Sequence, residues 1–394
     1  MIVEKNDLRD FLEENDVKFV RLMFSDVFGL IKNISVMPTE MDKAISAGIP
    51  VEACAVTGDR ADRQTVYLIP DLTTAALLPW RPSTGRVVRF FCEIRLADGS
   101  PYELDCRRLL RRTLQKRMKQ GLSCTVGAEC EFYLFRTDAD GEPTSVPFDR
   151  GTYLDAEPRD QGQNVRREIC LTLEDMGVSP QASMHEAGPG QNEIDFRYSD
   201  ALTSADNVIT LRSVVETVAA GRGLYATFDP KPIPNEPGSG FHINLMPYRM
   251  TEPQNRIDAP FAAGILTHAA ALSAFLNPVE SSYLRLCEPG APSEPGWSRA
   301  CGSPMMLLPE PDAEGRTRVM LRSPDPMANP YLAYALLLEA GFTGVEQALT
   351  LPEAGTARRA LPATVEEAAA QARASDFIRA ILPEQLLRIY THCR

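Results

Sequence analysis

The chain has 394 residues, of which 44% are hydrophobic and 24% are charged, and its formal net charge is -12. A single hydrophobic core rarely grows beyond about 250–300 residues, so this length favours two domains. The composition is that of a soluble globular protein. The acidic charge argues against a nucleic acid or an anionic membrane as the partner, although a local basic pocket can still bind ATP.

The N-terminal sequence and the cysteines both favour a cytoplasmic protein. The N-terminal residues are rich in charge and lack the apolar core of a signal peptide. The longest apolar segment, residues 259–278, contains Thr267 and His268 and ends at Asn277-Pro278, which favours a buried helix over a membrane span. The nine cysteines are scattered without a Cys-x-x-Cys pair, which is typical of free thiols.

Residues up to about 100 predict a small α+β unit. Residues 19–36 alternate between apolar and polar side chains and break at Phe28-Gly29, as a β-hairpin does. Residues 86–102 predict a further strand that is closed by an Asp-Gly turn. Residues 103–121 have the periodicity of an amphipathic helix that ends at a glycine, and we place the domain boundary after residue 102.

Strand and helix patterns alternate after this boundary. We expect strands at residues 124–135, 191–198, 225–232 and 240–247. We expect helices at residues 162–178 and 204–223, the second with Ser204 as its N-cap. Residues 319–345 predict a strand, a proline-rich turn and a buried helix, and the charged, alanine-rich residues 353–374 predict a surface helix.

Four glutamates stand where they can form a metal site. Glu129 and Glu131 are two positions apart in a predicted strand, so their side chains share a face and lie about 6.6 Å apart along it. That spacing suits two neighbouring hard cations better than chelation of one. Glu186 and Glu193 flank a Gly-Pro-Gly turn. Cys130 points to the opposite face of the strand, and we interpret it as a core residue.

A histidine and an asparagine extend this set. The sequence Gly-Ser-Gly-Phe-His-Ile-Asn places His242 and Asn244 on one face of a strand, after glycines that let the backbone approach a ligand closely. Four carboxylates and an imidazole are the surroundings that Mg²⁺ or Mn²⁺ prefers. Taken singly, a Glu-x-Glu pair is often only a solvated face of a strand, and a histidine after glycines is often structural.

The chain resembles glutamine synthetase of the bacterial and archaeal type over nearly its whole length. The resemblance rests on blocks that follow the family's order, among them FVRLMFSDVFGLIKNISV, GAECEFYLF, HEAGPGQNEIDFRYSDAL, GSGFHIN and LRSPDPMANPYLAYALLLEAG. It implies an α+β fold, with a β-grasp domain at residues 1–102 and a catalytic domain with a curved antiparallel sheet at residues 103–394. It also implies a dodecamer of two hexameric rings with active sites between adjacent subunits.

The resemblance also implies a reaction. Members of the family make an amide from glutamate, ATP and ammonia: the side-chain carboxylate attacks the terminal phosphate of ATP, and ammonia then displaces phosphate from the acyl phosphate. Such chemistry needs cations that neutralise phosphate charge and arginines that hold the anions. The implied partners are therefore ATP, a glutamate-like acid and an amine, with Mg²⁺ or Mn²⁺ as the cofactor.

Each candidate metal ligand matches a position of the family's motifs. Glu131, Glu186 and Glu193 match the ligands of the metal near the amino-acid substrate. Glu129 and His242 match two of the three ligands of the metal on the ATP phosphates.

The substrate and nucleotide positions are matched as well. Arg285 matches the arginine that holds the substrate's α-carboxylate, Gly238 a glycine of the substrate pocket, and Arg322 an arginine near the reacting carboxylate. The nucleotide side is assigned to Arg318, Asn244 and Lys231. For each arginine, the alternative is a structural ion pair.

Several departures from the family fall at positions that the resemblance assigns to metal or phosphate binding. Met320 stands where a metal-binding glutamate is usual, and a thioether is a poor ligand for Mg²⁺. Gly302 and Leu307 stand where arginines are expected, and losing one preorganised charge donor typically costs about 10²–10³ in rate. Arg299 is near enough in sequence to be a replacement.

The amine side departs from the family too. Residues 287–298 replace the flap that closes the site, with Glu288 displaced. Glu52 occupies the position of the family's ammonium-binding aspartate. Met184 occupies the position of a histidine, and Pro237 that of an asparagine. The tyrosine loop by which some members are adenylylated has no match, so we expect that control to be absent.

Three functions remain open from the sequence. The first is an ATP-dependent ligase that joins glutamate or a related acid to ammonia or, more in keeping with the departures, to another amine. The second is a catalytically impaired, ring-forming homologue with a scaffold or binding role. The third is a phosphotransferase that acts on another carboxylate or guanidino group without an amine step.

Overall fold

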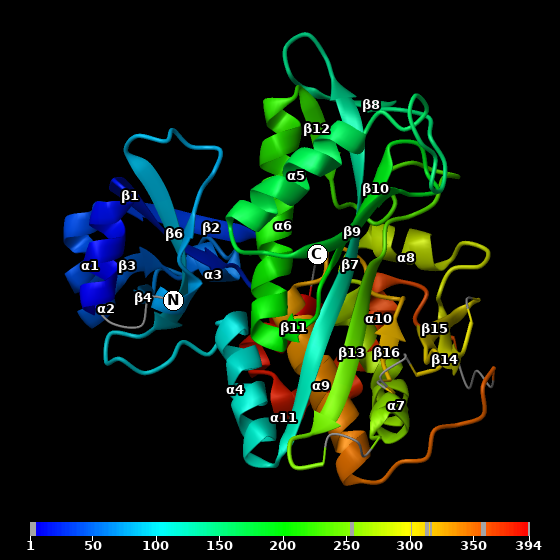
Figure 1. Cartoon of the computed structure of the whole chain (residues 1–394). Helices are drawn as coiled ribbons and strands as arrows, with labels where there is room; N and C mark the ends of the chain where they lie inside the picture. The colour runs from blue at the N-terminus through cyan, green and yellow to red at the C-terminus, as the bar shows by residue number, and fades with distance from the viewer. Residues whose placement is uncertain are drawn as a thin grey trace. The chain divides into compact units, whose positions relative to one another are not determined.

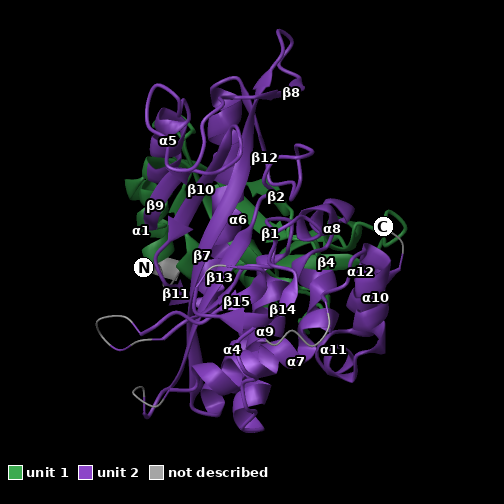
Figure 2. Ribbon diagram, turned by 90° about the vertical axis from the view of Figure 1, so that its right-hand side faces the viewer, with its two compact units in different colours: residues 1–109, 171–178 green, residues 110–170, 179–394 purple. Residues whose placement is uncertain are grey.

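The computed structural model describes residues 5–252, 256–300, 302–311, 315, 317–355 and 360–392. The chain divides into two compact units, which Figure 2 distinguishes by colour. The first contains residues 1–109 and 171–178, and the second contains residues 110–170 and 179–394. The domain boundary after residue 102 stays a prediction.

The first unit is the predicted α+β unit. Strands β1 (Val17–Ser25) and β2 (Ile31–Val36) form the expected antiparallel hairpin, and β1 pairs in parallel with β6 (Arg86–Arg95). The sheet order is β2-β1-β6-β4-β3, with β5 beside β6. Its other elements are α1 (Lys5–Glu14), α2 (Met41–Ser46), β3 (Ile49–Glu52), α3 (Cys54–Thr57), β4 (Thr65–Pro70) and β5 (Ala76–Leu77).

The second unit is built on a long central strand, β7 (Leu122–Thr137), which runs through the middle of Figure 1. The sheet order is β14-β15-β16-β13-β7-β10-β9, and β8, β11 and β12 also pair with β7. All these pairings are antiparallel except β14 with β15, and the sheet is curled, so the predicted curved antiparallel sheet is confirmed. The further strands are β8 (Pro143–Pro147), β9 (Pro180–His185), β10 (Gln191–Phe196), β11 (Ser199–Asp200), β12 (Leu224–Thr227), β13 (Phe241–Arg249), β14 (Glu294–Ser298), β15 (Pro304–Leu307) and β16 (Val319–Leu321).

Apolar helices pack against one face of this sheet. Helix α6 contacts β7 and β12, α7 contacts β13, and α9 packs against both α6 and α7. Strand side chains such as Cys130, Phe132 and Ile243 are fully buried in this core. The helices of this unit are α4 (Cys106–Lys119, which starts in the first unit), α5 (Gln163–Asp175, which ends in it), α6 (Ala201–Gly221), α7 (Asp258–Leu276), α8 (Glu280–Leu286), α9 (Pro330–Glu346), α10 (Val365–Ala374), α11 (Asp376–Ile381) and α12 (Glu384–Thr391). Because strand side chains alternate between faces, the neighbours of these core residues point to the other side, where the site lies.

The long apolar helix and the free cysteines are both as the sequence predicted. Helix α7 is the one described helix that is long and apolar enough to cross a membrane, but most of it is buried against α9 and α10, as expected of a core helix. Seven of the cysteines are described, and all seven are free thiols.

The structure corrects the predicted start of α6. The helix begins at Ala201, and its N-cap is Asp200, whose carboxylate accepts hydrogen bonds from the backbone N–H groups of Leu202 and Thr203. The predicted N-cap, Ser204, is buried inside the first turn. Aspartate and serine cap helices about equally well, so the apolar pattern alone placed the start too late.

The C-terminal surface helix is also shorter than expected. Within residues 353–374, the described helix is only α10, and Thr364 caps it by accepting a hydrogen bond from the backbone of Glu367. Residues 356–359 lie outside the described residues. Pro362 lacks the backbone N–H that a helix interior requires, which is consistent with a helix that starts after it.

The closest approach between α7 and α9 yields a first prediction. A Cβ atom on Gly264 would lie 2.2 Å from the carbonyl oxygen of Ala340 and 2.9 Å from Cα of Gly344. Alanine normally stabilises a helix relative to glycine, but here it would force two backbones apart. We expect Gly264→Ala to destabilise the protein by about 1–3 kcal/mol, measured as a lower unfolding temperature.

Gly221→Ala is the matched control. Gly221 is also helical, and a Cβ there would meet nothing within 4 Å. This change should leave the unfolding temperature unchanged or raise it slightly. Equal effects of the two changes would contradict the close helix packing.

Candidate metal and substrate site

Strand register brings the predicted metal ligands together. Glu193 on β10 pairs directly with Glu131 on β7, and Asp195 pairs with Glu129. On the other side of β7, His242 of β13 also pairs with Glu129. Directly paired residues share a face of the sheet. One row therefore contains His242, Glu129 and Asp195, and the next row contains Glu131 and Glu193.

These rows line a cleft of about 820 Å³ in the second unit. The predicted site residues that line it are Glu129, Glu131, Glu186, Glu193, Gly238, His242, Arg285, Arg318 and Arg322. The positions at which the chain departs from the family also line it, namely Met184, Pro237, Glu288, Leu307 and Met320. Residues that match the family's motifs and residues that depart from them thus line the same cleft.

The Gly-Pro-Gly turn places Glu186 beside Glu193. The backbone N–H of Glu186 donates to the carbonyl oxygen of Gln191 at 2.9 Å, which closes the turn. A Cβ on Gly188 would lie 1.9 Å from the hydroxyl oxygen of Tyr133, and Gly190 has a φ of +72°, a conformation that favours glycine. The two glycines are therefore needed for the turn that joins two metal-ligand candidates.

A third glycine marks the point where the two rows and an arginine converge. A Cβ on Gly240 would lie 2.8 Å from Nε2 of His242, 3.0 Å from Nη2 of Arg285 and 3.1 Å from Oε1 of Glu131. The N–H of Gly240 donates to Oε2 of Glu131 at 2.9 Å. The guanidinium of Arg285 is oriented by the carbonyl oxygens of Ser323, at 2.9 Å, and Arg322, at 3.0 Å. Without the glycine, these side chains could not approach one another.

The second row concentrates negative charge in a buried place. The exposed fractions of Glu131 and Glu193 are only 8% and 7%. Burial raises the pKa of Glu193, and the charge of Glu131 raises it further. Burial also raises the pKa of Glu131, against the opposing effect of His242. Burial disfavours the ionised form of these two carboxylates, and a bound cation would stabilise that form.

In the first row, polar neighbours stabilise the negative charge of Glu129. Nδ1 of His242 lies 3.1 Å from Oε2 of Glu129, and Nδ2 of Asn244 donates to Oε1 of Glu129 at 2.8 Å. Burial acts to raise the pKa of Glu129, but these contacts and the nearby charge of Arg318 leave that pKa lowered. Burial raises the pKa of Asp195 to about 6. Glu129 is thus held as a carboxylate, with His242 as its neighbour.

The donor set fits a hard divalent cation. Ligand atoms of Glu129, Glu193 and His242 lie within 4.8 Å of one another. Oδ1 of Asp195 and Oδ1 of Asn244 are buried and have no hydrogen-bond partner. Buried oxygens without partners are costly unless a cation or water meets them. Carboxylate oxygens with one imidazole are ligands suited to Mg²⁺ or Mn²⁺.

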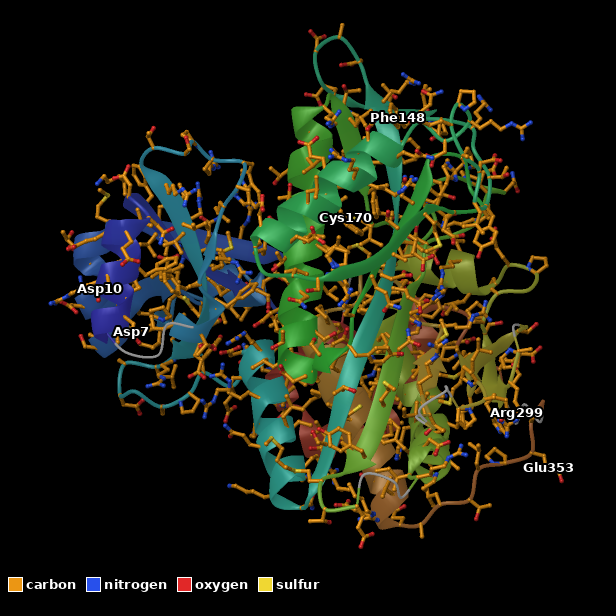
Figure 3. The ribbon with its side chains drawn as sticks, viewed as in Figure 1. Asp7, Asp10, Phe148, Cys170, Arg299 and Glu353 are labelled. Carbon is orange, nitrogen blue, oxygen red and sulfur yellow. The ribbon has the colours of Figure 1, made fainter. Side chains whose placement is uncertain are left out.

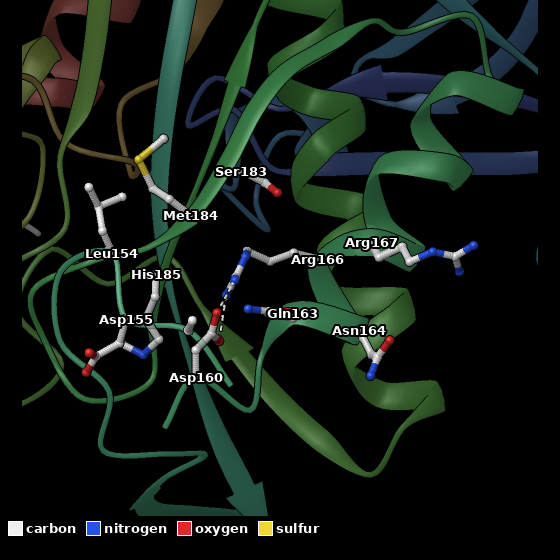
Figure 4. Close-up of a pocket in the computed structure, with 11 residues that line it drawn as sticks. Leu154, Asp155, Asp160, Gln163, Asn164, Arg166, Arg167, Ser183, Met184 and His185 are labelled. Atoms are coloured by element: carbon white, nitrogen blue, oxygen red, sulfur yellow. Dashed lines mark hydrogen bonds and ion pairs between the residues drawn. The ribbon is translucent and has the colours of Figure 1, made fainter. Parts of the chain in front are cut away.

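A second group of ligand-like side chains includes Asp160 and His185, which line a separate hollow of about 480 Å³ (Figure 4). Asp149, Asp160 and His185 also come within 4.8 Å, but their charges are already satisfied. Asp160 pairs with Arg166, as the dashed lines in Figure 4 show. Both ring nitrogens of His185 face acceptors, Asp149 Oδ1 at 2.8 Å and the carbonyl oxygen of Glu186 at 2.6 Å. A histidine that donates from both nitrogens is an imidazolium, so this group is a balanced structural network that holds Glu186 in place.

Two cleft residues escaped the sequence analysis. Asp195 stands two residues after Glu193 in β10, and Gln191 stands two residues before it. Gln191 donates from Nε2 to Oε2 of Glu131 at 2.8 Å, and it therefore orients that carboxylate. The signal was available, because the i, i+2 rule that groups Glu129 with Glu131 applies equally to β10.

Two residues with suggested roles, Lys231 and Arg299, do not line the cleft. Lys231 is almost buried and binds the carboxylate of Glu288 and the carbonyl oxygen of Glu236. Arg299, labelled in Figure 3, pairs with Glu310 at 2.8 Å and is not among the residues that line the cleft. Its side chain therefore does not replace the missing arginines in this structure.

Glu52 belongs to the first unit. Its Oε2 accepts from Nη1 of Arg63 at 2.6 Å, and its side chain is half exposed. The role in ammonium binding that the resemblance suggests for it stays a proposal.

Comparison with known families and proteins decides the classification. Residues 16–97 match the glutamine synthetase β-grasp domain, and residues 103–394 match the glutamine synthetase catalytic domain. Glutamine synthetase of Clostridium saccharobutylicum is 40% identical over 362 residues, which cover 88% of this chain and 81% of that protein. The enzyme of Staphylococcus epidermidis is 40% identical over 363 residues, which cover 89% and 81%.

The chain belongs to the glutamine synthetase family. Membership makes the protein an ATP-dependent ligase that forms carbon–nitrogen bonds, and it confirms the resemblance found in the motifs.

Solved structures show the same fold. GmaS (γ-glutamylmethylamide synthetase) without ligand has a TM-score of 0.85 and 26% identity, covering 98% of this chain and 94% of that one. GmaS in complex with ADP has a TM-score of 0.85 and 25% identity, covering 97% and 94%. A glutamine synthase homologue has a TM-score of 0.82 at 22% identity over 95% of this chain and 92% of that one, which supports the fold alone.

Two of the departures from the family, Met320 and Leu307, lie in neighbouring strands and line the cleft. Met320 of β16 pairs with Asn244 of β13 on one side and with Leu307 of β15 on the other. Arg322 donates from Nη1 to the carbonyl oxygen of Gly302 at 2.6 Å. Cys301, in the same divergent segment, lies outside the described residues. A thioether and an aliphatic side chain thus stand where the family has charged groups.

The buried carboxylates make a prediction about pH and metal. A carboxyl group whose pKa is raised by folding binds more protons in the folded state, so the stability of the metal-free protein falls as pH rises. We expect metal-free Glu193→Gln to be more stable than wild type at pH 8, by up to about 1.4 kcal/mol for each unit by which folding raises the pKa of Glu193, and therefore to unfold at a higher temperature. The two proteins should differ little at pH 5. Differential scanning fluorimetry in EDTA and in Mn²⁺ measures this.

Addition of Mn²⁺ should reverse the order at pH 8, because only wild type keeps the full ligand set. Glu310→Gln, at a side chain that is 73% exposed, is the control and should show neither effect. A difference between wild type and Glu193→Gln that does not change between pH 5 and pH 8 would refute the buried-charge account.

Proposed function

We propose that the protein phosphorylates the side-chain carboxylate of glutamate, or of a related acid, with ATP and joins it to an amine other than ammonia. The proposal rests on one observation above all. The guanidinium of Arg285 meets Glu131 and His242 around Gly240, so an anchor for an α-carboxylate stands next to the buried metal-ligand candidates. That arrangement can hold an acidic substrate close to a cation and to the phosphates of ATP.

The chain's own residues divide the work of this reaction. Glu131, Glu186 and Glu193 would hold one cation and Glu129 with His242 another, and these cations supply neutralisation of phosphate charge when bound. Arg285 would bind the α-carboxylate, and Arg322 would stabilise the side-chain carboxylate as it reacts. Asn244 fixes the orientation of Glu129 through its hydrogen bond.

The chemistry proceeds in two steps. A carboxylate oxygen of the acid bonds to the terminal phosphorus of ATP, and the bond from that phosphorus to ADP breaks. The amine nitrogen then bonds to the acyl carbon, and inorganic phosphate leaves. A proton must leave the nitrogen, and a carboxylate is the group that can accept it. We propose Glu52 for this role by family resemblance, with Arg318 and Lys231 on the nucleotide side.

The preference for a substituted amine follows from the altered lining. Met184 brings a thioether beside Glu186, where the family has a histidine, and Pro237 replaces an asparagine near Gly238. Both changes make the lining of the cleft more apolar. The structural likeness to GmaS, whose name refers to a methylamide, supports the same direction.

An amine panel tests the proposal. The protein is incubated with ATP, Mg²⁺ or Mn²⁺ and glutamate, together with ammonia, methylamine, longer alkylamines or diamines. We expect amine-dependent phosphate release, with kcat/KM for one substituted amine at least about tenfold above ammonia, which corresponds to about 1.4 kcal/mol. Mass spectrometry should identify the γ-glutamyl amide.

Two arginine variants are the matched controls. Arg285→Ala should lower kcat/KM by about 10²-fold or more through loss of substrate binding. Arg299→Ala, at an exposed arginine outside the cleft lining, should stay near wild type. Nucleotide binding without any turnover would favour the impaired, ring-forming homologue, and a stable phosphorylated product without amine would favour a phosphotransferase.

We also propose, from the family resemblance, that the protein is a cytoplasmic homo-oligomer of two hexameric rings. Light scattering in solution should then give a mass near twelve times the 43.5 kDa of one chain. A mass of one or two chains at micromolar concentration would contradict this.

A further inference from the structure

We propose that Asp195 supplies the third protein ligand of the nucleotide-side cation, in place of the glutamate that this chain has lost at Met320. The inference rests on the proposed two-cation site, and it concerns Mg²⁺ or Mn²⁺ bound by the first row. It assigns a binding role to a residue that is not among the metal ligands implied by the family resemblance.

The position of Asp195 follows from the register. Glu129 lies between His242 and Asp195 in one row across three adjacent strands, β13, β7 and β10. Paired positions of this kind bring Cβ atoms within about 4.5–5.5 Å, so His242 and Asp195 are the two direct cross-strand neighbours of Glu129. All three line the same cleft.

The surroundings of Asp195 leave a ligand oxygen free. Its Oδ1 is buried and has no hydrogen-bond partner, and no lysine, arginine or histidine in the described parts of the chain forms an ion pair with it. The carboxylate's hydrogen-bonding neighbour is Glu193, another acid. An acid whose neighbour is an acid, and whose second oxygen is unpartnered, has no structural role that the fold explains.

A second unpartnered oxygen belongs to Asn244, which lies on the other side of Glu129 from Asp195. Asn244 is 3% exposed, donates from Nδ2 to Glu129, and leaves its buried Oδ1 without a partner. It stands two residues after His242 in β13, so the two side chains share a face. Among the described residues, only three buried carboxylate or amide oxygens lack partners, and two of them flank Glu129. Both oxygens are therefore available as ligands of a cation that binds at Glu129.

Met320 cannot take this role. It stands beyond Asn244 in the neighbouring strand, and its thioether sulfur is a soft ligand that Mg²⁺ does not favour. With Glu193 assigned to the other cation, Glu129 and His242 alone would leave this cation with two protein ligands. Asp195 adds an oxygen from the opposite side of Glu129 and completes a carboxylate–carboxylate–imidazole set.

Manganese titration of the metal-free protein tests this assignment without substrates. Free Mn²⁺ is followed by electron paramagnetic resonance for wild type, Asp195→Asn and Asp195→Asn with Met320→Glu. We expect two Mn²⁺ per wild-type chain, and we expect Asp195→Asn to keep one and to bind the other at least about tenfold more weakly. Met320→Glu should restore the weakened site, because it returns a carboxylate to the other flank of Glu129.

Control variants separate a ligand role from a folding defect. Glu131→Gln should weaken the other ion, and Glu310→Gln should change neither. Unchanged binding of both ions by Asp195→Asn would overturn the assignment, and so would a loss that Met320→Glu fails to restore. Because no substrate is present, failure here is distinct from failure of the amine panel, which would leave the manganese result intact.

Discussion

Buried negative charge at strand positions that face one cleft is the constraint on which the rest of this structure depends. The register of β7, β10 and β13 leaves no freedom: once Glu193 pairs with Glu131, Asp195 must pair with Glu129, and His242 lies on the other side. A slip of one residue would turn all these carboxylates into the helix-covered core. The apolar residues between them, such as Cys130, therefore fix the site as firmly as the acids do, because they keep the register.

Close backbone approach is the second condition for the site. Gly240 lies where three functional side chains converge, and Gly188 leaves room for the Tyr133 hydroxyl, so neither position tolerates a Cβ without movement. Behind them, the network around His185 binds the carbonyl oxygen of Glu186 and fixes the direction of that segment. The candidate metal ligands are thus held in place by groups outside the candidate set, which is how a protein can keep like charges near one another before a cation binds.

Sequence patterns predicted the parts of the site that follow from alternation along a strand. They did not predict contacts between residues that the pattern does not relate. Alternation in GAECEFYLF correctly grouped Glu129 with Glu131, and the same rule would have found Asp195 had it been applied to β10. Ser204 was the wrong N-cap because Asp200 competes for the same role, and short-range preferences do not separate them. The surroundings of Arg299 could not be predicted, because its partner Glu310 lies outside any helix or strand and no sequence periodicity relates the two residues.

The charge of the cleft favours the binding of divalent cations. Seven acidic side chains and three arginines line it, a formal excess of four negative charges, and two divalent cations would balance that excess. ATP and an acidic substrate bring further negative charge. Where the family sequence leads one to expect two more arginines, this chain has Gly302 and Leu307, which add none. The remaining positive charge must come from the ions and from Arg285, Arg318 and Arg322. Binding of the phosphates is therefore coupled to how well the strand carboxylates hold their cations.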